Sequence, residues 1–154
     1  MYRYDYVLRL IERLGQVLRS LRNRLLQQRE LTDEDIRAEL HEIAREAGLD
    51  LDFARRLDLA TLATWLAPVP DKVDEPRVWL MAELLHVEAL HARATGHEQR
   101  AVDDLRRALA LFARIPPAWR PGDDAPSAGE RVAELQALLP PDVAPVMPMR
   151  VRTR

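Results

Sequence analysis

Residues 78–112 read VWLMAELLHVEALHARATGHEQRAVDDLRRALALF, which is the most informative stretch of the chain. Apolar residues recur every three or four positions on both sides of Gly96, which is the spacing of one face of an α-helix. The pattern predicts one helix that ends near Gly96 and a second that runs from about Glu98 to Ile115, where Pro116 stops it. Two helices joined by so short a turn favour an antiparallel hairpin.

Small and large residues follow one another in this hairpin in the order typical of a tetratricopeptide repeat. In such a repeat small side chains let two helices approach closely, a glycine makes the turn and a leucine fills the space between the helices. The residues at these repeat-packing positions are Ala89, Gly96, Ala101, Leu105 and Ala108. Residues 78–115 therefore resemble a tetratricopeptide-repeat hairpin, although Glu88 and Ala92 stand where the repeat usually has large side chains. A plain helical hairpin is the alternative interpretation.

Over a wider span, the chain is similar to a family of small bacterial helical proteins whose function is unknown. The likeness rests on the Asp5-Tyr6 pair in the first helix, the turn at residues 47–50 and the repeat-like pair. The resemblance implies an architecture and no activity.

Capping patterns predict where the outer helices begin. Residues 32–35 begin a second helix that Gly48 ends, and a third helix is expected over residues 50–66. The hairpin begins at residues 74–76, where an aspartate can cap and a proline suits the first turn. A serine and a glutamate at 127–130 form a capping box for a sixth helix. Because no apolar period of two residues occurs, we predict an all-α fold of about six helices in antiparallel hairpins.

The first segment carries a seam of apolar residues at alternating steps of three and four. Such a seam is typical of a coiled coil or of a buried helix face. Because a chain of 154 residues has few other helices to cover so long a seam, we expect self-association through it, as a homodimer or another homo-oligomer. Burial within one chain is the alternative. The expected self-association residues are Tyr4, Val7, Ile11, Leu14, Leu18, Leu21 and Leu25.

Charge is unevenly distributed along the chain. Residues 1–29 hold seven arginines against Asp5 and Glu12, a net of +5, whereas the whole chain carries −2. The overall charge disfavours nucleic acid as a partner, but the arginine-rich helix could lie on an anionic membrane surface. We expect three segments: the amphipathic helix at 1–29, a helical domain at 30–139 with the repeat-like hairpin at 76–115, and a proline- and arginine-rich tail at 140–154.

Few residues combine into a pattern that carries chemistry. Glu83 and His86 form an E-x-x-H step, of which di-iron bundles use two to hold their metals. One step is too few, so His86 is expected to cap an apolar edge or face solvent. Residues 43–57 match a helix-turn-helix spacing, but Asp50 and Asp52 stand where side chains that read bases belong. We therefore expect no catalytic, metal-binding or cofactor-binding residues.

These observations favour a non-catalytic helical adaptor or scaffold that binds a protein partner, whose identity the sequence does not give, and that associates with itself. The alternative is a peripheral membrane or nucleic-acid-binding protein that works through the arginine-rich first helix. No cysteine is present, and the cytoplasm is the expected compartment.

Overall fold

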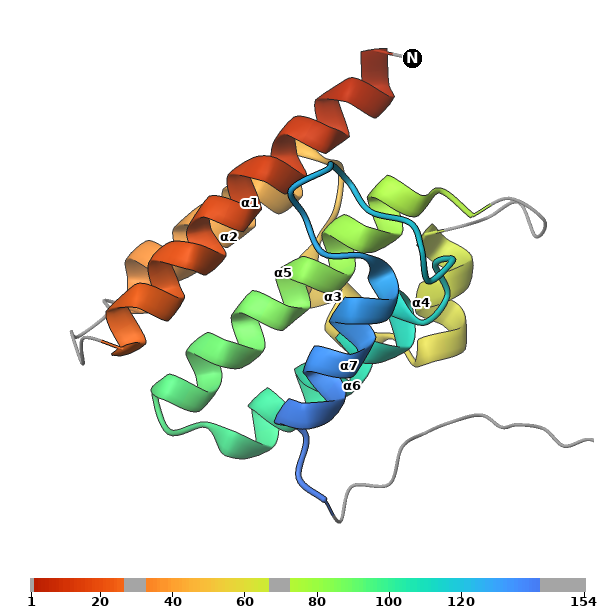
Figure 1. Cartoon of the computed structure of the whole chain (residues 1–154). Coiled ribbons are helices and arrows are strands. Elements are labelled where there is room, and N and C mark those ends of the chain that lie inside the picture. The colour runs from red at the N-terminus through yellow and green to blue at the C-terminus, as the bar shows by residue number, and fades with distance from the viewer. Residues whose placement is uncertain (1, 27–32, 67–72, 142–154) are drawn as a thin grey trace, which may run out of the picture.

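All regular structure that the computed structural model describes is helical. The structure describes residues 2–26, 33–66 and 73–141, and no strand occurs among them, which confirms the all-α prediction (Figure 1). Its seven helices are α1 (Tyr2–Leu26), α2 (Asp33–Glu46), α3 (Leu51–Arg56), α4 (Leu59–Leu66), α5 (Glu75–Ala94), α6 (Glu98–Phe112) and α7 (Ala128–Leu138). The predicted cap at Thr32 and most of the predicted tail lie outside the described residues.

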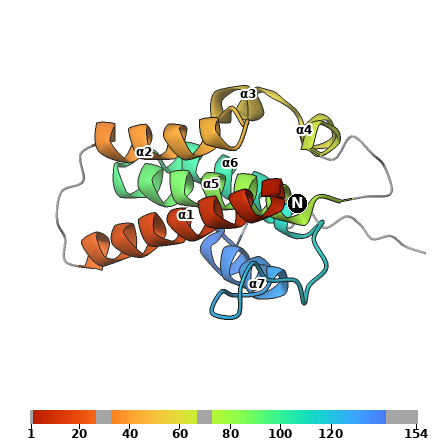
Figure 2. The same cartoon turned by 90° about the horizontal axis from the view of Figure 1, so that it is seen from above.

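Helix α5 lies at the centre of the molecule. Fifteen of its 20 residues are buried. Its apolar side chains surround the helix axis, as expected of a helix that other helices enclose. Helices α2 to α4 lie on one side of α5 and α7 lies on the opposite side, while α1 and α6 pack along its length (Figures 1 and 2). Helices α4 and α7 make their main helix contacts with α6, so α5 and α6 together form the centre on which the other described helices pack.

A tight turn joins α5 to α6. Gly96 has φ +85°, a left-handed conformation that favours glycine over residues with a side chain. The chain then turns back, so that α6 lies beside α5 (Figure 1). The small residues expected at the contact, Ala89, Ala101 and Ala108, are each fully buried, and Leu105 is 1% exposed.

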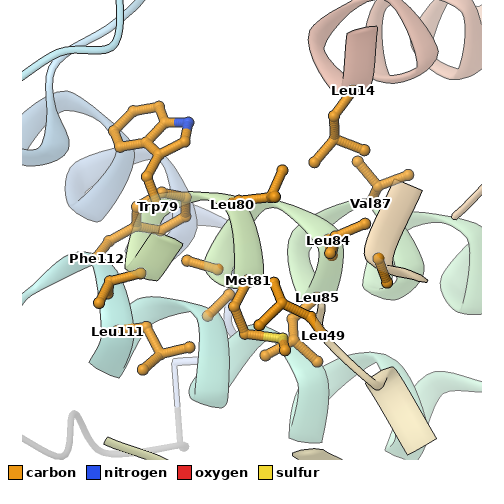
Figure 3. Packing of buried hydrophobic residues seen from close by; sticks show 14 of the residues in the cluster. Leu14, Leu49, Trp79, Leu80, Met81, Leu84, Leu85, Val87, Leu111 and Phe112 are labelled. Carbon is orange, nitrogen blue, oxygen red and sulfur yellow. The ribbon is translucent and has the colours of Figure 1, made fainter. Parts of the chain in front are cut away.

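Helix α1 packs its apolar seam against α5 within one chain. Figure 3 shows Leu14 reaching from α1 toward Val87 and Leu84 of α5. The buried side chains of the seam are Val7, Ile11, Leu14 and Leu18. The expectation that a single chain cannot cover this seam is therefore wrong for these four residues, because the enclosed central helix supplies an apolar surface. Self-association itself stays a prediction. The side chains of Tyr4, Leu21 and Leu25 lie outside the described part of the structure.

The third helix expected over residues 50–66 is two helices. Leu57 has an extended backbone, with φ −91° and ψ 146°, and it ends α3. The Asp58 side chain then accepts a hydrogen bond from the backbone N–H of Thr61 at 2.7 Å, which begins α4. An aspartate at this position offers the helix N-terminus a capping acceptor and so competes with continuation of α3. The expected number of six helices becomes seven for this reason.

The predicted capping box of the last helix is confirmed. Glu130 N–H donates to Ser127 Oγ at 3.2 Å, and Ser127 N–H donates to Glu130 Oε1 at 2.8 Å. The segment before α7 is held by the backbone bond from Ala128 N–H to the Trp119 carbonyl at 2.8 Å. Trp119 lies against Trp79 of α5, with ring centroids 5.6 Å apart. These contacts hold α7 near α5, and α7 packs chiefly against α6.

Candidate functional site

The central helix carries four buried titratable side chains in two identical steps. Glu83 and His86 form one E-x-x-H step, and Glu88 and His91 form a second that the sequence analysis missed, although ELLHVEALH repeats it within nine residues. Residues five positions apart in a helix point about 140° away from each other around the axis. The two steps therefore face different neighbours, and one helix cannot bring them into a single site.

The first step forms a buried cluster with α7. Arg131 Nε donates to Glu83 Oε1 at 3.1 Å, and Nη2 donates to Oε2 at 2.5 Å. His86 Nδ1 lies 2.8 Å from Glu83 Oε1, and Arg131 Nη1 donates to Glu134 Oε1 at 2.8 Å. The expectation that His86 faces solvent or caps an apolar edge is wrong, because its side chain is fully buried and bonded to Glu83. We call these four residues the α7 cluster.

Electrostatics in the α7 cluster favour the ionised pair. Burial alone would raise the pKa of Glu83, but the hydrogen bond from His86 and the charge of Arg131 outweigh it and hold that pKa below its ordinary value. Burial likewise opposes the charge of Arg131, and the neighbouring Glu83 outweighs it, so the pKa of Arg131 is raised. Arg131 also lies over the Trp79 ring, 5.9 Å from its centroid. A bidentate arginine–carboxylate pair of this kind fixes both distance and orientation.

The second step contributes Glu88 to a cluster with α3 and α6. Arg55 Nη2 donates to Glu88 Oε1 at 2.6 Å and to Asp104 Oδ2 at 3.1 Å. Arg100 Nη2 also donates to Glu88 Oε1, at 3.1 Å. Arg107 Nη2 donates to the Arg55 carbonyl at 2.9 Å, so it ties α3 to α6. We call Arg55, Glu88, Arg100 and Asp104 the α3 cluster.

Burial dominates the titration of Asp104 in the α3 cluster. It raises the pKa of this carboxyl group above its ordinary value, and the charge of Arg55 only partly offsets the effect. Glu88 stands where a tetratricopeptide repeat usually has a large apolar residue. Its ion pairs with Arg55 and Arg100 give a physical reason for this departure.

Neither cluster has the geometry of a metal site. No group of three metal-ligating side chains occurs among the described residues. In the α7 cluster both oxygens of Glu83 already accept hydrogen bonds from Arg131, a cation that would repel a bound metal. The ion pairs of the two clusters are suited to holding α7 and α3 in fixed positions relative to α5.

A surface that the sequence analysis missed lies on α3 and α4. Helix α4 reads LATLATWL without a charged residue, and only Leu62 and Leu66 of it are buried. On α3, Phe53 is 40% exposed, and its ring meets the Trp65 ring edge to face with centroids 5.4 Å apart. We call this the α3–α4 surface, and its members are Phe53, Leu57, Leu59, Ala60, Thr61, Ala63, Thr64 and Trp65. The signal in the sequence is the uncharged run from 59 to 70.

The helix-turn-helix spacing at residues 43–57 does not give a base-reading helix in the structure. Helix α3 is six residues long, and its Arg55 side chain is turned inward to the α3 cluster. Toward solvent, α3 presents Asp52, Phe53 and Arg56, and the exposed charged residues on either side of it are Asp50 and Asp58. A carboxylate and an apolar ring suit a protein surface better than a phosphate backbone.

Comparisons with protein-family models, with curated proteins and with solved structures give no match. The resemblance of residues 78–115 to a tetratricopeptide repeat therefore stays a prediction. None of the described helices combines the length and the apolar character that crossing a membrane requires.

Proposed function

We propose that this chain is a non-catalytic helical adaptor of the cytoplasm that binds another protein through the α3–α4 surface. The observation that carries the proposal is the pair of partly exposed aromatic rings, Phe53 and Trp65, beside a helix without charge. Aromatic residues are enriched in protein–protein interfaces, where they contribute much of the binding free energy. The two rings meet across α3 and α4, and exposed apolar side chains brought together in this way favour an interaction site.

The polar groups on the α3–α4 surface favour burial under a partner. The Thr64 hydroxyl donates to the Ala60 carbonyl at 3.0 Å, so it is already bonded without water. The backbone N–H of Thr61 donates to Asp58 Oδ1 at 2.7 Å, so it too is bonded within the chain. Covering these groups leaves few hydrogen bonds to replace, which lowers the desolvation cost of binding.

The α3 cluster supplies a firm base for this surface. Arg55 belongs to α3, the helix that carries Phe53. Its guanidinium group donates hydrogen bonds both to Glu88 of α5 and to Asp104 of α6. Because α3 is already fixed in this way, it loses little conformational freedom when a partner binds to it. This supports a preformed docking surface.

The rim of the surface indicates the chemistry of the partner. The exposed charged residues on α3 and its flanks are Asp50, Asp52, Arg56 and Asp58. Three of these four are acidic, so complementarity favours a partner with an apolar centre and basic residues around it.

Photo-crosslinking in the native cell tests this proposal. The photoreactive amino acid benzoylphenylalanine replaces Phe53 in one variant and the exposed residue Gln136 of α7 in a matched control. We expect a discrete protein adduct from position 53 and none from position 136. Adding Ala60→Arg to the first variant should abolish the adduct, because it places a charge on the apolar centre of the surface.

The mass of the adduct also tests self-association. An adduct of twice the chain mass would identify a second copy as the occupant, whereas another mass would identify a different partner. Equal crosslinking from positions 53 and 136, or an adduct that persists with Ala60→Arg, would contradict the α3–α4 surface as the binding site.

A further inference from the structure

A pocket lies where the ends of three helices meet, apart from the α3–α4 surface. The first turns of α1, the end of α2 and the start of α5 line an open pocket with a volume of about 680 Å³. Small-molecule sites occupy roughly 300 to 1,000 Å³. The side chains and backbone that matter to its chemistry are Tyr6, Arg9, Glu46, Gly48 and Arg77.

The pocket contains two guanidinium groups whose charge is not compensated by its acidic residue. Arg9 comes from α1 and Arg77 from α5, and neither guanidinium has a hydrogen bond or ion pair within the described part of the chain. Glu46 also lines the pocket, but its carboxylate accepts from Arg13 Nη1 at 3.0 Å and from the Tyr6 hydroxyl at 3.1 Å. Arg13, a residue outside the lining, shares its charge between Glu46 and Glu39, to which its Nε donates at 3.1 Å. Arg9 and Arg77 therefore still outweigh the negative charge of Glu46 in the lining.

The backbone at the end of α2 adds little repulsion toward an anion. The last carbonyls of a helix carry partial negative charge when they lack partners. Here Gly48, with φ +74°, lets the chain fold back so that Gly48 N–H donates to the Arg45 carbonyl at 3.0 Å. Leu49 N–H donates to the Ala44 carbonyl at 2.8 Å. These bonds engage carbonyl groups that would otherwise point past the helix end.

We propose that this pocket binds a phosphate group between Arg9 and Arg77. A guanidinium group presents several N–H donors in one plane and matches the oxygens of phosphate in a bidentate manner. Two such groups from different helices balance the two negative charges of a phosphate, and the 39% exposed ring of Tyr6 offers a face to the rest of the ligand. The phosphate can belong to a soluble compound or to a lipid headgroup.

Titration of the full chain with inorganic pyrophosphate, followed by calorimetry and by the amide NMR signal of Gly48, tests the site. We expect saturable binding, and Arg9→Gln and Arg77→Gln should each weaken it about tenfold through loss of a charge-assisted contact. Arg19→Gln on α1 and Arg106→Gln on α6 are matched controls, since each removes the same charge from an exposed arginine outside the pocket. The controls should change the affinity less than about twofold.

Sedimentation with vesicles separates the two sources of phosphate. Vesicles of phosphatidylcholine with phosphatidic acid are compared with vesicles of phosphatidylcholine alone. Retention that Arg9→Gln and Arg77→Gln abolish and Arg19→Gln preserves would assign a lipid headgroup, and pyrophosphate binding without retention would assign a soluble ligand. The absence of saturable pyrophosphate binding and of specific retention, or equal weakening by all four variants, would overturn the proposal.

Discussion

Helices α1 and α4 both carry apolar residues at helical spacing, but the molecule uses them in opposite ways. Helix α1 buries Val7, Ile11, Leu14 and Leu18 against α5, whereas α4 buries only Leu62 and Leu66 and leaves six of its eight residues at least partly exposed. The α3–α4 segment is held by four buried apolar side chains and also by Arg55 with its carboxylate partners. Apolar periodicity therefore predicts a helix, but it does not predict which helix leaves apolar side chains exposed.

The largest effect is expected from a charge placed in the seam of α1. Leu14→Glu puts a carboxylate where the side chain is fully buried, and we expect the chain to lose its folded state. The matched change Ala60→Glu on exposed α4 should alter the free energy of unfolding by less than about 0.5 kcal/mol. Circular dichroism during urea denaturation measures both. A folded, monomeric Leu14→Glu chain derived from a dimeric parent would instead show that the seam is an interface between copies.

Loss of Arg55 should loosen α3 and α4 and leave α1 in place. Arg55→Met leaves Asp104 without its bidentate partner, although Arg100 still pairs with Glu88, so we expect a cost of about 1 to 3 kcal/mol. Hydrogen exchange should rise in α3 and α4 and stay unchanged in α1. Arg56→Met is the control, because this neighbouring side chain is exposed. Equal loosening of α1 would contradict separate attachment of the two regions.

Acid should distinguish the two ion clusters and leave the apolar contact of α1 with α5 unaffected. Glu83 has a native pKa below its ordinary value of 4.5, so its stabilisation is fully present above pH 4.5 and is lost as the pH falls through the native pKa. Asp104 has a native pKa above its ordinary value of 3.8. Its contribution to stability is therefore fully present below pH 3.8 and is lost as the pH rises through the native pKa.

Urea denaturation between about pH 3 and pH 6 measures these opposite contributions as slopes of stability against pH. Glu83→Gln should make the loss of stability in acid shallower than in the parent, and Asp104→Asn should make it steeper. Slopes that change in the same direction for both variants would show that the pKa of one of these carboxyl groups is shifted in the other direction.

The sequence predicted the helices well where a local signal decides them. Asp74, Gly96 and the Ser127–Glu130 box each act through backbone groups within a few residues, so spacing alone locates them. The split between α3 and α4 also has a local signal, the cap at Asp58. It was not predicted because the apolar residues on both sides of Asp58 continue at the spacing of a single helix.

The two clusters could not be assembled from the sequence. Arg55 meets Glu88 and Asp104 across 33 and 49 positions, and Arg131 meets Glu83 across 48. Pairings at such separation depend on how the helices pack, which the pattern of a single helix does not contain. The repeated E-x-x-H step was visible in the sequence, but its two halves acquire different partners only because α7 and α3 lie on different sides of α5 (Figure 2).

The smallest expected effect on stability belongs to the α3–α4 surface, and it is the sharpest test of the contrast with α1. Thr64→Arg alters an exposed residue on the outward face of α4, so the melting temperature should stay within a few degrees of the parent. The same change should abolish the adduct formed from position 53, because the added charge would be buried under the partner without a counter-ion. Ala94→Arg, at the exposed end of α5, is the control for charge and should preserve the adduct. If Thr64→Arg lowers the melting temperature as a core substitution does, α4 is covered within the chain as α1 is, and the two helices do not differ in the way proposed.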